Sequence, residues 1–170
     1  VSITNSEFDN ISGWVIFDTR AGSGGVAGDD GSVLTSGVFS NNIINNSSGE
    51  VNFRQNTVTV GTPAYADVTI ADNTVTNVGA NTNGFGAVFK LFNAGTVDFT
   101  GNSVSGVGAN GAVLMTRNTT ALNVSGNTFS DNNMVYEIEA GKSLPGTTTF
   151  TDNTFTNDAY DIYLPTTLVG

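Results

Sequence analysis

A short motif that repeats along the chain constrains the fold more than any other feature of the sequence. The motif reads apolar-x-apolar-x-x-Asn-x-apolar, and its clearest copies are VTIADNTVTN from Val68, VDFTGNSVSG from Val97, LNVSGNTFSD from Leu122 and TTFTDNTFTN from Thr148. Looser copies begin at Val1 and Ser32, and a second apolar segment follows every copy. The chain of 170 residues therefore consists of six copies of one structural unit.

Each unit is too small to fold alone. Its apolar and polar residues alternate over short stretches, which indicates strands, and no helical periodicity is present. Such a unit cannot bury its own apolar face, whereas stacking it on its neighbours does so. The repeat therefore predicts an all-β fold, a parallel β-solenoid of six coils with three strands in each coil. We expect one domain over residues 1–170.

The alignment of the copies predicts which residues lie above one another. We place the sixth motif position at Ser6, Gly37, Asn73, Asn102, Asn127 and Asn153. Because coils stack about 4.8 Å apart, two inward columns are expected: Ile3, Leu34, Ile70, Phe99, Val124 and Phe150 in one, and Phe8, Phe39, Val75, Val104, Phe129 and Phe155 in the other. The repeated asparagines are interpreted as structural, because Asn tolerates the left-handed conformation of a tight corner and stacked amides hydrogen-bond one another.

The composition excludes several classes of protein. The chain has no histidine and no cysteine, which excludes zinc fingers, haem sites and Ser-His-Asp or Cys-His catalytic sites. Its 15 acidic and 5 basic side chains give a net charge of −10, which disfavours nucleic acid and anionic membranes as partners. No apolar run reaches the roughly 18 residues of a membrane span. We therefore expect no nucleic-acid binding and no membrane insertion.

The few positive charges gather on the third strand of the coils. Placing the apolar residues of those strands inward puts Arg20, Arg54, Lys90 and Arg117 on one outer face, together with Phe92 and Tyr163. A row of cations that repeats with the coils fits an anionic polymer, and Arg offers a planar fork to carboxylates. The alternative is that these cations pair with acids on a solvent-facing strand, which contributes about 1 kcal/mol or less per pair.

The ends of the predicted stack point to another class of function. Residue 1 begins directly in a strand, and no capping helix follows the last copy, so open coils expose strand edges and apolar residues. Either the chain is a piece of a longer β-helix, or its coils join head to tail into filaments.

The repeated blocks resemble right-handed parallel β-helix proteins of the pectate-lyase-like superfamily, and especially polysaccharide lyase family six, which includes chondroitinase B and alginate lyases. YEIEAGKS from Tyr136, followed by DNTF from Asp152, is similar to the strand and corner at the active groove of those enzymes. The resemblance implies that Lys142 is the base that abstracts the C5 proton of a uronate and that Glu137 and Glu139 bind calcium. The family also uses an Arg one coil further on, where this chain has the stretch around Tyr163.

These observations predict a right-handed parallel β-helix that is secreted or displayed at the cell surface. Its expected role is non-catalytic contact with an acidic, uronate-containing polysaccharide along the third-strand face. No cofactor is required for that role, and Ca²⁺ is the ion that the resemblance allows. The alternatives are a structural or adhesive module that stacks head to tail and a fragment of a polysaccharide lyase.

Overall fold

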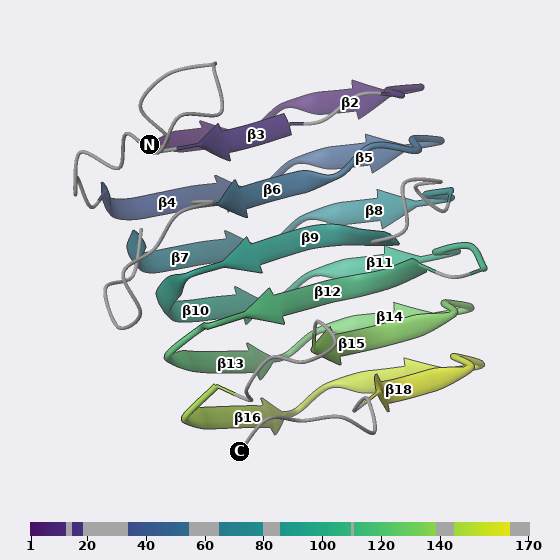
Figure 1. Cartoon of the computed structure of the whole chain (residues 1–170). Helices are drawn as coiled ribbons and strands as arrows, with labels where there is room; N and C mark the ends of the chain where they lie inside the picture. The colour runs from purple at the N-terminus through teal and green to yellow at the C-terminus, as the bar shows by residue number, and fades with distance from the viewer. Residues whose placement is uncertain are drawn as a thin grey trace.

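The computed structural model describes residues 1–12, 15–18, 34–54, 65–79, 86–109, 111–138 and 145–163. These residues form eighteen strands, which wind into six coils stacked on one another (Figure 1). Each coil contributes one strand to each of three parallel, six-stranded sheets. Among the described residues, no helix is long and apolar enough to cross a membrane. The all-β parallel solenoid that the repeat predicts is confirmed.

The three sheets take the first, second and third strand of every coil. Sheet A consists of β1 (Ser2–Thr4), β4 (Leu34–Ser40), β7 (Tyr65–Ala71), β10 (Ala94–Thr100), β13 (Ala121–Ser125) and β16 (Thr147–Thr151). Sheet B consists of β2 (Glu7–Asp9), β5 (Ile43–Asn45), β8 (Thr74–Thr76), β11 (Ser103–Ser105), β14 (Thr128–Ser130) and β17 (Thr154–Thr156). Sheet C consists of β3 (Val15–Asp18), β6 (Val51–Arg54), β9 (Gly86–Phe92), β12 (Gly111–Arg117), β15 (Met134–Ile138) and β18 (Tyr160–Tyr163).

Aromatic rings from all three sheets meet inside the solenoid. Phe99 of sheet A, Phe129 of sheet B and Phe89 of sheet C are almost completely buried. The centroid of the Phe99 ring lies 5.4 Å from that of Phe89 and 6.2 Å from that of Phe129. Each such burial stabilises the fold by about 1.5–3 kcal/mol. The sheets therefore close around one apolar core, which holds most of the phenylalanines.

The structure corrects the predicted inward columns at the second coil. Ile3 pairs with Phe39 and not with Leu34, and Phe8 pairs with Ile44 and not with Phe39. From the third coil onward, the members of both columns lie in register as predicted. The error is thus confined to one copy of the motif.

The predicted ladder position of the second coil, Gly37, is wrong for the same reason. Gly37 pairs with Val68, which is the first apolar position of the next copy. Asn42 takes the ladder position, since its Oδ1 accepts a hydrogen bond from the Ser6 backbone N–H at 2.9 Å. Because Gly37 occupies the first apolar position of this copy, the hydrophobic pattern of the motif is incomplete there. The copy is therefore difficult to align from sequence.

A ladder of asparagine side chains ties the coils together where sheets A and B meet. Its members are Asn42, Asn73, Asn102, Asn127 and Asn153. Asn102 shows the pattern: its Oδ1 accepts from the backbone N–H and Nδ2 of Asn73, at 3.0 and 2.9 Å. Its Nδ2 donates to the Ile70 carbonyl at 2.9 Å and to Asn127 Oδ1 at 3.1 Å. The structural interpretation of these asparagines is confirmed.

The sequence predicts the left-handed conformation at the ladder asparagines themselves. In the structure, the residue before each ladder asparagine adopts it instead. Asp72 (φ 56°) precedes Asn73, and Gly101 (φ 65°) precedes Asn102. A Cβ atom added to Gly101 would overlap with Asp72 Oδ1 of the coil before. Glycine suits this corner, because a positive φ is costly for most side chains, while Asp72 and Asp152 take the same conformation in the equivalent corners.

One hydroxyl pair lies within the apolar core of sheet C. The hydroxyl of Tyr136 is 2.8 Å from Thr116 Oγ1, and both residues are 1% exposed. Burial raises the pKa of Tyr136, and its hydrogen bond with Thr116 opposes part of that rise. The pair satisfies two polar groups that water cannot reach.

The ladder predicts a large effect of one buried amide on stability. Asn102→Ala leaves the Asn73 N–H and the Ile70 carbonyl without partners, so we expect the free energy of unfolding to fall by about 2–4 kcal/mol. Asn123→Ala is the matched control, because Asn123 is only partly buried and bonds to Asp98 and Thr149 on the outer face of sheet A. Urea denaturation of both variants checks this, and equal losses would contradict the buried ladder as the main tie between coils.

Candidate functional site

Stacking brings most of the candidate residues with described side chains to the outer face of sheet C. The register places Asn52, Lys90, Met115, Glu137 and Tyr163 in one column. Phe92 pairs with Arg117 in the outward column beside it. The sequence therefore correctly predicts that Lys90, Phe92, Arg117, Glu137 and Tyr163 share a face. It does not predict that Lys90 and Arg117 stand in different columns of that face.

The strands of sheet C bend, so that two consecutive residues face the core. Val113 and Leu114 both belong to the main core, whereas Ala112 and Met115 on either side belong to a separate apolar cluster. The pairing of β12 with β9 correspondingly omits Val113. The separate cluster consists of Ala87, Phe92, Ala112 and Met115, with Met134 packed against it. The outer face of sheet C thus has a buried apolar patch of its own.

Lys90 lies on this face, but it is buried in an ion pair. Its ammonium contacts Glu50 Oε2, and the Lys90 and Glu50 side chains are only 7% and 3% exposed. Asn52 Nδ2 donates a hydrogen bond of 3.4 Å to the other carboxylate oxygen of Glu50. The sequence predicts an exposed cation here, whereas in the structure Glu50 balances the charge of Lys90 away from solvent. Lys90 is therefore unsuited to direct contact with a polymer.

The structure describes the side chains of Lys90 and Arg117. Of these two, Arg117 reaches the surface of this face. Its guanidinium carbon lies 4.0 Å from the centroid of the Phe92 ring, and Arg117 is partly exposed. A cation over an aromatic ring gains about 0.5–1 kcal/mol at such a site. Phe92 is 8% exposed, so its ring supports Arg117 and presents little surface to a ligand. The pair therefore holds one guanidinium in a defined place.

Two tyrosines of β18 extend the same face, and the sequence singles out only one of them. Tyr163 pairs with Glu137, and Tyr160 pairs with Met134 of the outer apolar cluster. They are 40% and 55% exposed, and their ring centroids lie 6.0 Å apart. Strict alternation would place residues three apart on opposite faces, but the bend of sheet C places both tyrosines outward. Two adjacent apolar residues face inward in each of β9, β12 and β15. This repeated pair in the sequence would have predicted that Tyr160 faces outward.

Several predicted site residues lie outside what the structure describes. Arg20, Glu139 and Lys142 are outside the described residues, and only the backbone of Arg54 is described, at the end of β6. Glu137 lies on β15 and is partly exposed. Among the described residues, no group of three or more acidic side chains could hold a metal ion. The catalytic role of Lys142 and the calcium site at Glu137 and Glu139 stay predictions.

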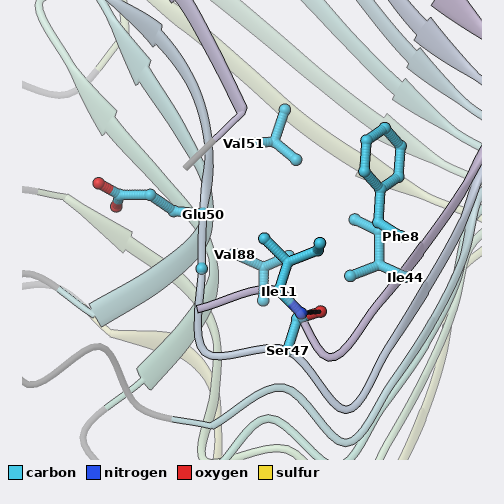
Figure 2. A pocket seen from close by; sticks show the side chains of 8 residues that line it. Phe8, Ile11, Ile44, Ser47, Glu50, Val51 and Val88 are labelled. Atoms are coloured by element: carbon cyan, nitrogen blue, oxygen red, sulfur yellow. Dashed lines mark hydrogen bonds between the residues drawn. The ribbon is translucent and has the colours of Figure 1, made fainter. Parts of the chain in front are cut away.

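A small apolar pocket lies beside the first three coils (Figure 2). Its lining residues are Phe8, Ile11, Ile44, Ser47, Gly49, Glu50, Val51 and Val88. The Glu50 carboxylate points away from the apolar side chains of the pocket, in keeping with its ion pair to Lys90 (Figure 2). Ser47 Oγ is already bonded to the Asn45 carbonyl and to the Ile11 N–H. The pocket offers little polar chemistry to a ligand.

One family model, that of the right handed beta helix region, matches residues 1–166. No curated protein and no solved structure matches the chain. The family match supports the right-handed parallel β-helix expected from the sequence and agrees with the three parallel sheets. It carries no information on the pectate-lyase-like superfamily or polysaccharide lyase family six, and that resemblance stays a prediction.

The buried pair predicts a characteristic double-mutant cycle. Glu50→Gln or Lys90→Met alone leaves one buried charge without its partner, so each is expected to lower the free energy of unfolding by about 3 kcal/mol. The double variant removes both charges and should recover most of that loss. Urea denaturation of the four proteins gives the coupling energy. Additive losses would contradict a buried, mutually neutralised pair.

Proposed function

Because this chain belongs to the right-handed β-helix family, we propose that it is a non-catalytic module that contacts an acidic polysaccharide. The contact surface is the outer face of sheet C between β12 and β18. The observation that carries the proposal is the guanidinium of Arg117, held over Phe92 on the same face as two exposed tyrosines.

Arg117 supplies the recognition of an acidic group. Its planar fork of donors matches a carboxylate or sulfate, and charge-assisted hydrogen bonds of this kind are the strong ones. Stacking on Phe92 limits the conformations of the side chain, which lowers the entropy lost on binding. A guanidinium that is held in place in this way supports binding with specificity.

Tyr160 and Tyr163 supply the contact with sugar rings. Each combines an apolar ring with a hydroxyl, and a side chain of this type suits a surface with one apolar and one wet side. The two rings already contact each other edge to face, which limits their motion before binding. Two coils beyond Arg117, Tyr163 lies at the register of Met115 and Tyr160 at that of Ala112, so a polymer that crosses the strands obliquely can contact the arginine and the tyrosines together.

Binding to a panel of alginate, pectate, partly methyl-esterified pectin and chondroitin sulfate tests the proposal. At least one polymer should bind, and Arg117→Gln and Tyr163→Ala should each weaken that binding about tenfold, which corresponds to about 1.4 kcal/mol. Thr128→Ala is the matched control, because Thr128 is an exposed residue on sheet B. Isothermal titration calorimetry measures the affinities. No binding to any member, or binding that the two variants leave unchanged, would contradict the proposal.

The second candidate function is that of a structural module. In such a module, the last described coil of one copy stacks on a coil of another copy. The observation that favours it is the exposure of β18, where Tyr160 is 55% and Ile162 47% exposed although Ile162 stands in the inward column of Tyr136. Strand edges with exposed apolar residues are templates for pairing.

Sedimentation tests the structural candidate. The protein should form assemblies that grow with concentration, and Ile162→Glu should abolish them by placing a charge where the next coil would stack. Thr128→Glu, which places the same charge on the outer face of sheet B, should leave assembly intact. Analytical ultracentrifugation gives the size distribution, and a monomer at all concentrations would count against this function.

A further inference from the structure

Beyond the proposed function, we infer that the chain forms a covalent cross-link between two of its own coils, an isopeptide bond that joins Lys90 to Asn52. The bond fastens the third coil to the second. The inference comes from three buried polar side chains at the outer face of sheet C, which are the amine of Lys90, the amide of Asn52 and the carboxylate of Glu50.

The register of sheet C brings the amine and the amide together. Lys90 on β9 pairs directly with Asn52 on β6, and the residues on either side of both along their strands belong to the main core. Both side chains therefore lie on the outward side, on strands about 4.8 Å apart, and both are nevertheless buried. The fold thus holds the two groups next to each other away from water, and such positioning replaces a collision between separate molecules.

One carboxylate contacts both nitrogen atoms that take part in the reaction. The Lys90 ammonium contacts Glu50 Oε2, while Asn52 Nδ2 donates a hydrogen bond of 3.4 Å to Oε1. The nitrogen that attacks and the nitrogen that leaves are thus held at the two oxygens of one acid. Proton transfer between them needs an acid–base group within reach of both, and Glu50 fulfils this condition.

The contacts of the unreacted site favour the reaction. Asn52 Oδ1 is buried, and no donor among the described residues hydrogen-bonds to it. Lys90 and Glu50 place two charges in a site with little access to water, and burying charges costs free energy even when they are paired. The product is neutral, because Lys90 becomes an amide and Glu50 an uncharged acid. That acid can donate a hydrogen bond to the Asn52 carbonyl.

The step balances in atoms and charge. Glu50 takes a proton from the Lys90 ammonium, and the lone pair of the neutral amine attacks Asn52 Cγ to form the Cγ–Nζ bond. Glu50 then passes its proton to Nδ2, the Cγ–Nδ2 bond breaks, and ammonia leaves with the electron pair of that bond. Finally, Glu50 takes the surplus proton from Nζ and ends as a neutral acid. The balance requires no oxidant, reductant or cofactor.

The cross-link gives the chain a covalent tie between coils that its composition otherwise lacks. The sequence has no cysteine, so no disulfide can join its coils. A link between distant residues restricts the unfolded chain and opposes separation of the two coils. The double-mutant cycle of Glu50 and Lys90 described above applies to molecules in which the ion pair has not reacted.

Mass spectrometry of the denatured protein tests the inference. The intact mass should be lower than the mass of the sequence by one ammonia molecule. In a tryptic digest, residues 21–54 should be joined to residues 55–117, because trypsin does not cut after an acylated Lys90. Fragmentation should place the link at Asn52. An intact mass equal to that of the sequence, or a loss of ammonia without the joined peptide, would overturn the inference.

Variants assign the role of each group. Lys90→Arg keeps a positive charge beside Glu50 but lacks the reacting amine, so both the mass loss and the joined peptide should vanish. Glu50→Gln should slow bond formation about a hundredfold, measured as the linked fraction over time, because it removes the acid–base group. Asn123→Ala is the matched control, since this amide lies on the outer face of sheet A, and it should retain the full loss of ammonia.

Three results would overturn parts of the assignment. Loss of water in place of ammonia, with Lys90 linked to Glu50, would show that Asn52 is not the acyl partner. A joined peptide that persists in Lys90→Arg would exclude the amine of Lys90. Bond formation at an unchanged rate in Glu50→Gln would exclude Glu50 as the proton carrier.

Discussion

Register between stacked coils is the constraint on which the rest of the structure depends. The strands of neighbouring coils pair in parallel, and outside the bend of sheet C side chains alternate between the core and the outer face. A slip by one residue would exchange those two sets and bury polar groups in place of apolar ones. The buried amides between sheets A and B oppose such a slip, because each joins the coil before to the coil after. Their hydrogen bonds also satisfy backbone groups at corners where no strand partner is available.

Register also decides the chemistry of the outer faces. Residues that are far apart in sequence become neighbours in a column, so a charge on one coil finds its partner on another. Glu50 and Lys90 meet in this way, and Arg117 comes to lie over Phe92. Among the described residues, this pairing buries Lys90 and interrupts the row of exposed cations that the sequence predicts.

The sequence predicts the fold well wherever the motif is complete. Phe99 and Asn102 stand where the repeat places them, because an apolar residue and an amide at fixed separation allow few alternatives. The second coil is misaligned because Gly37 occupies an apolar position and weakens the pattern, while Leu34 and Phe39 offer a false match five residues earlier. Tyr160 was missed for another reason, since strict alternation does not contain the bend that turns two consecutive residues of sheet C inward.

The sequence by itself determined that six similar units stack, which residues fill most of the core, and four of the five amides of the ladder, with Asn42 as the exception. These properties follow from periodicity, which local side-chain chemistry encodes directly. Only the tertiary structure decided that Lys90 is buried against Glu50, that Phe92 supports Arg117, and that Tyr160 joins Tyr163 on one face. Exposure and pairing depend on contacts between coils and on the bend of the strands, and the repeat pattern of a single coil does not contain either.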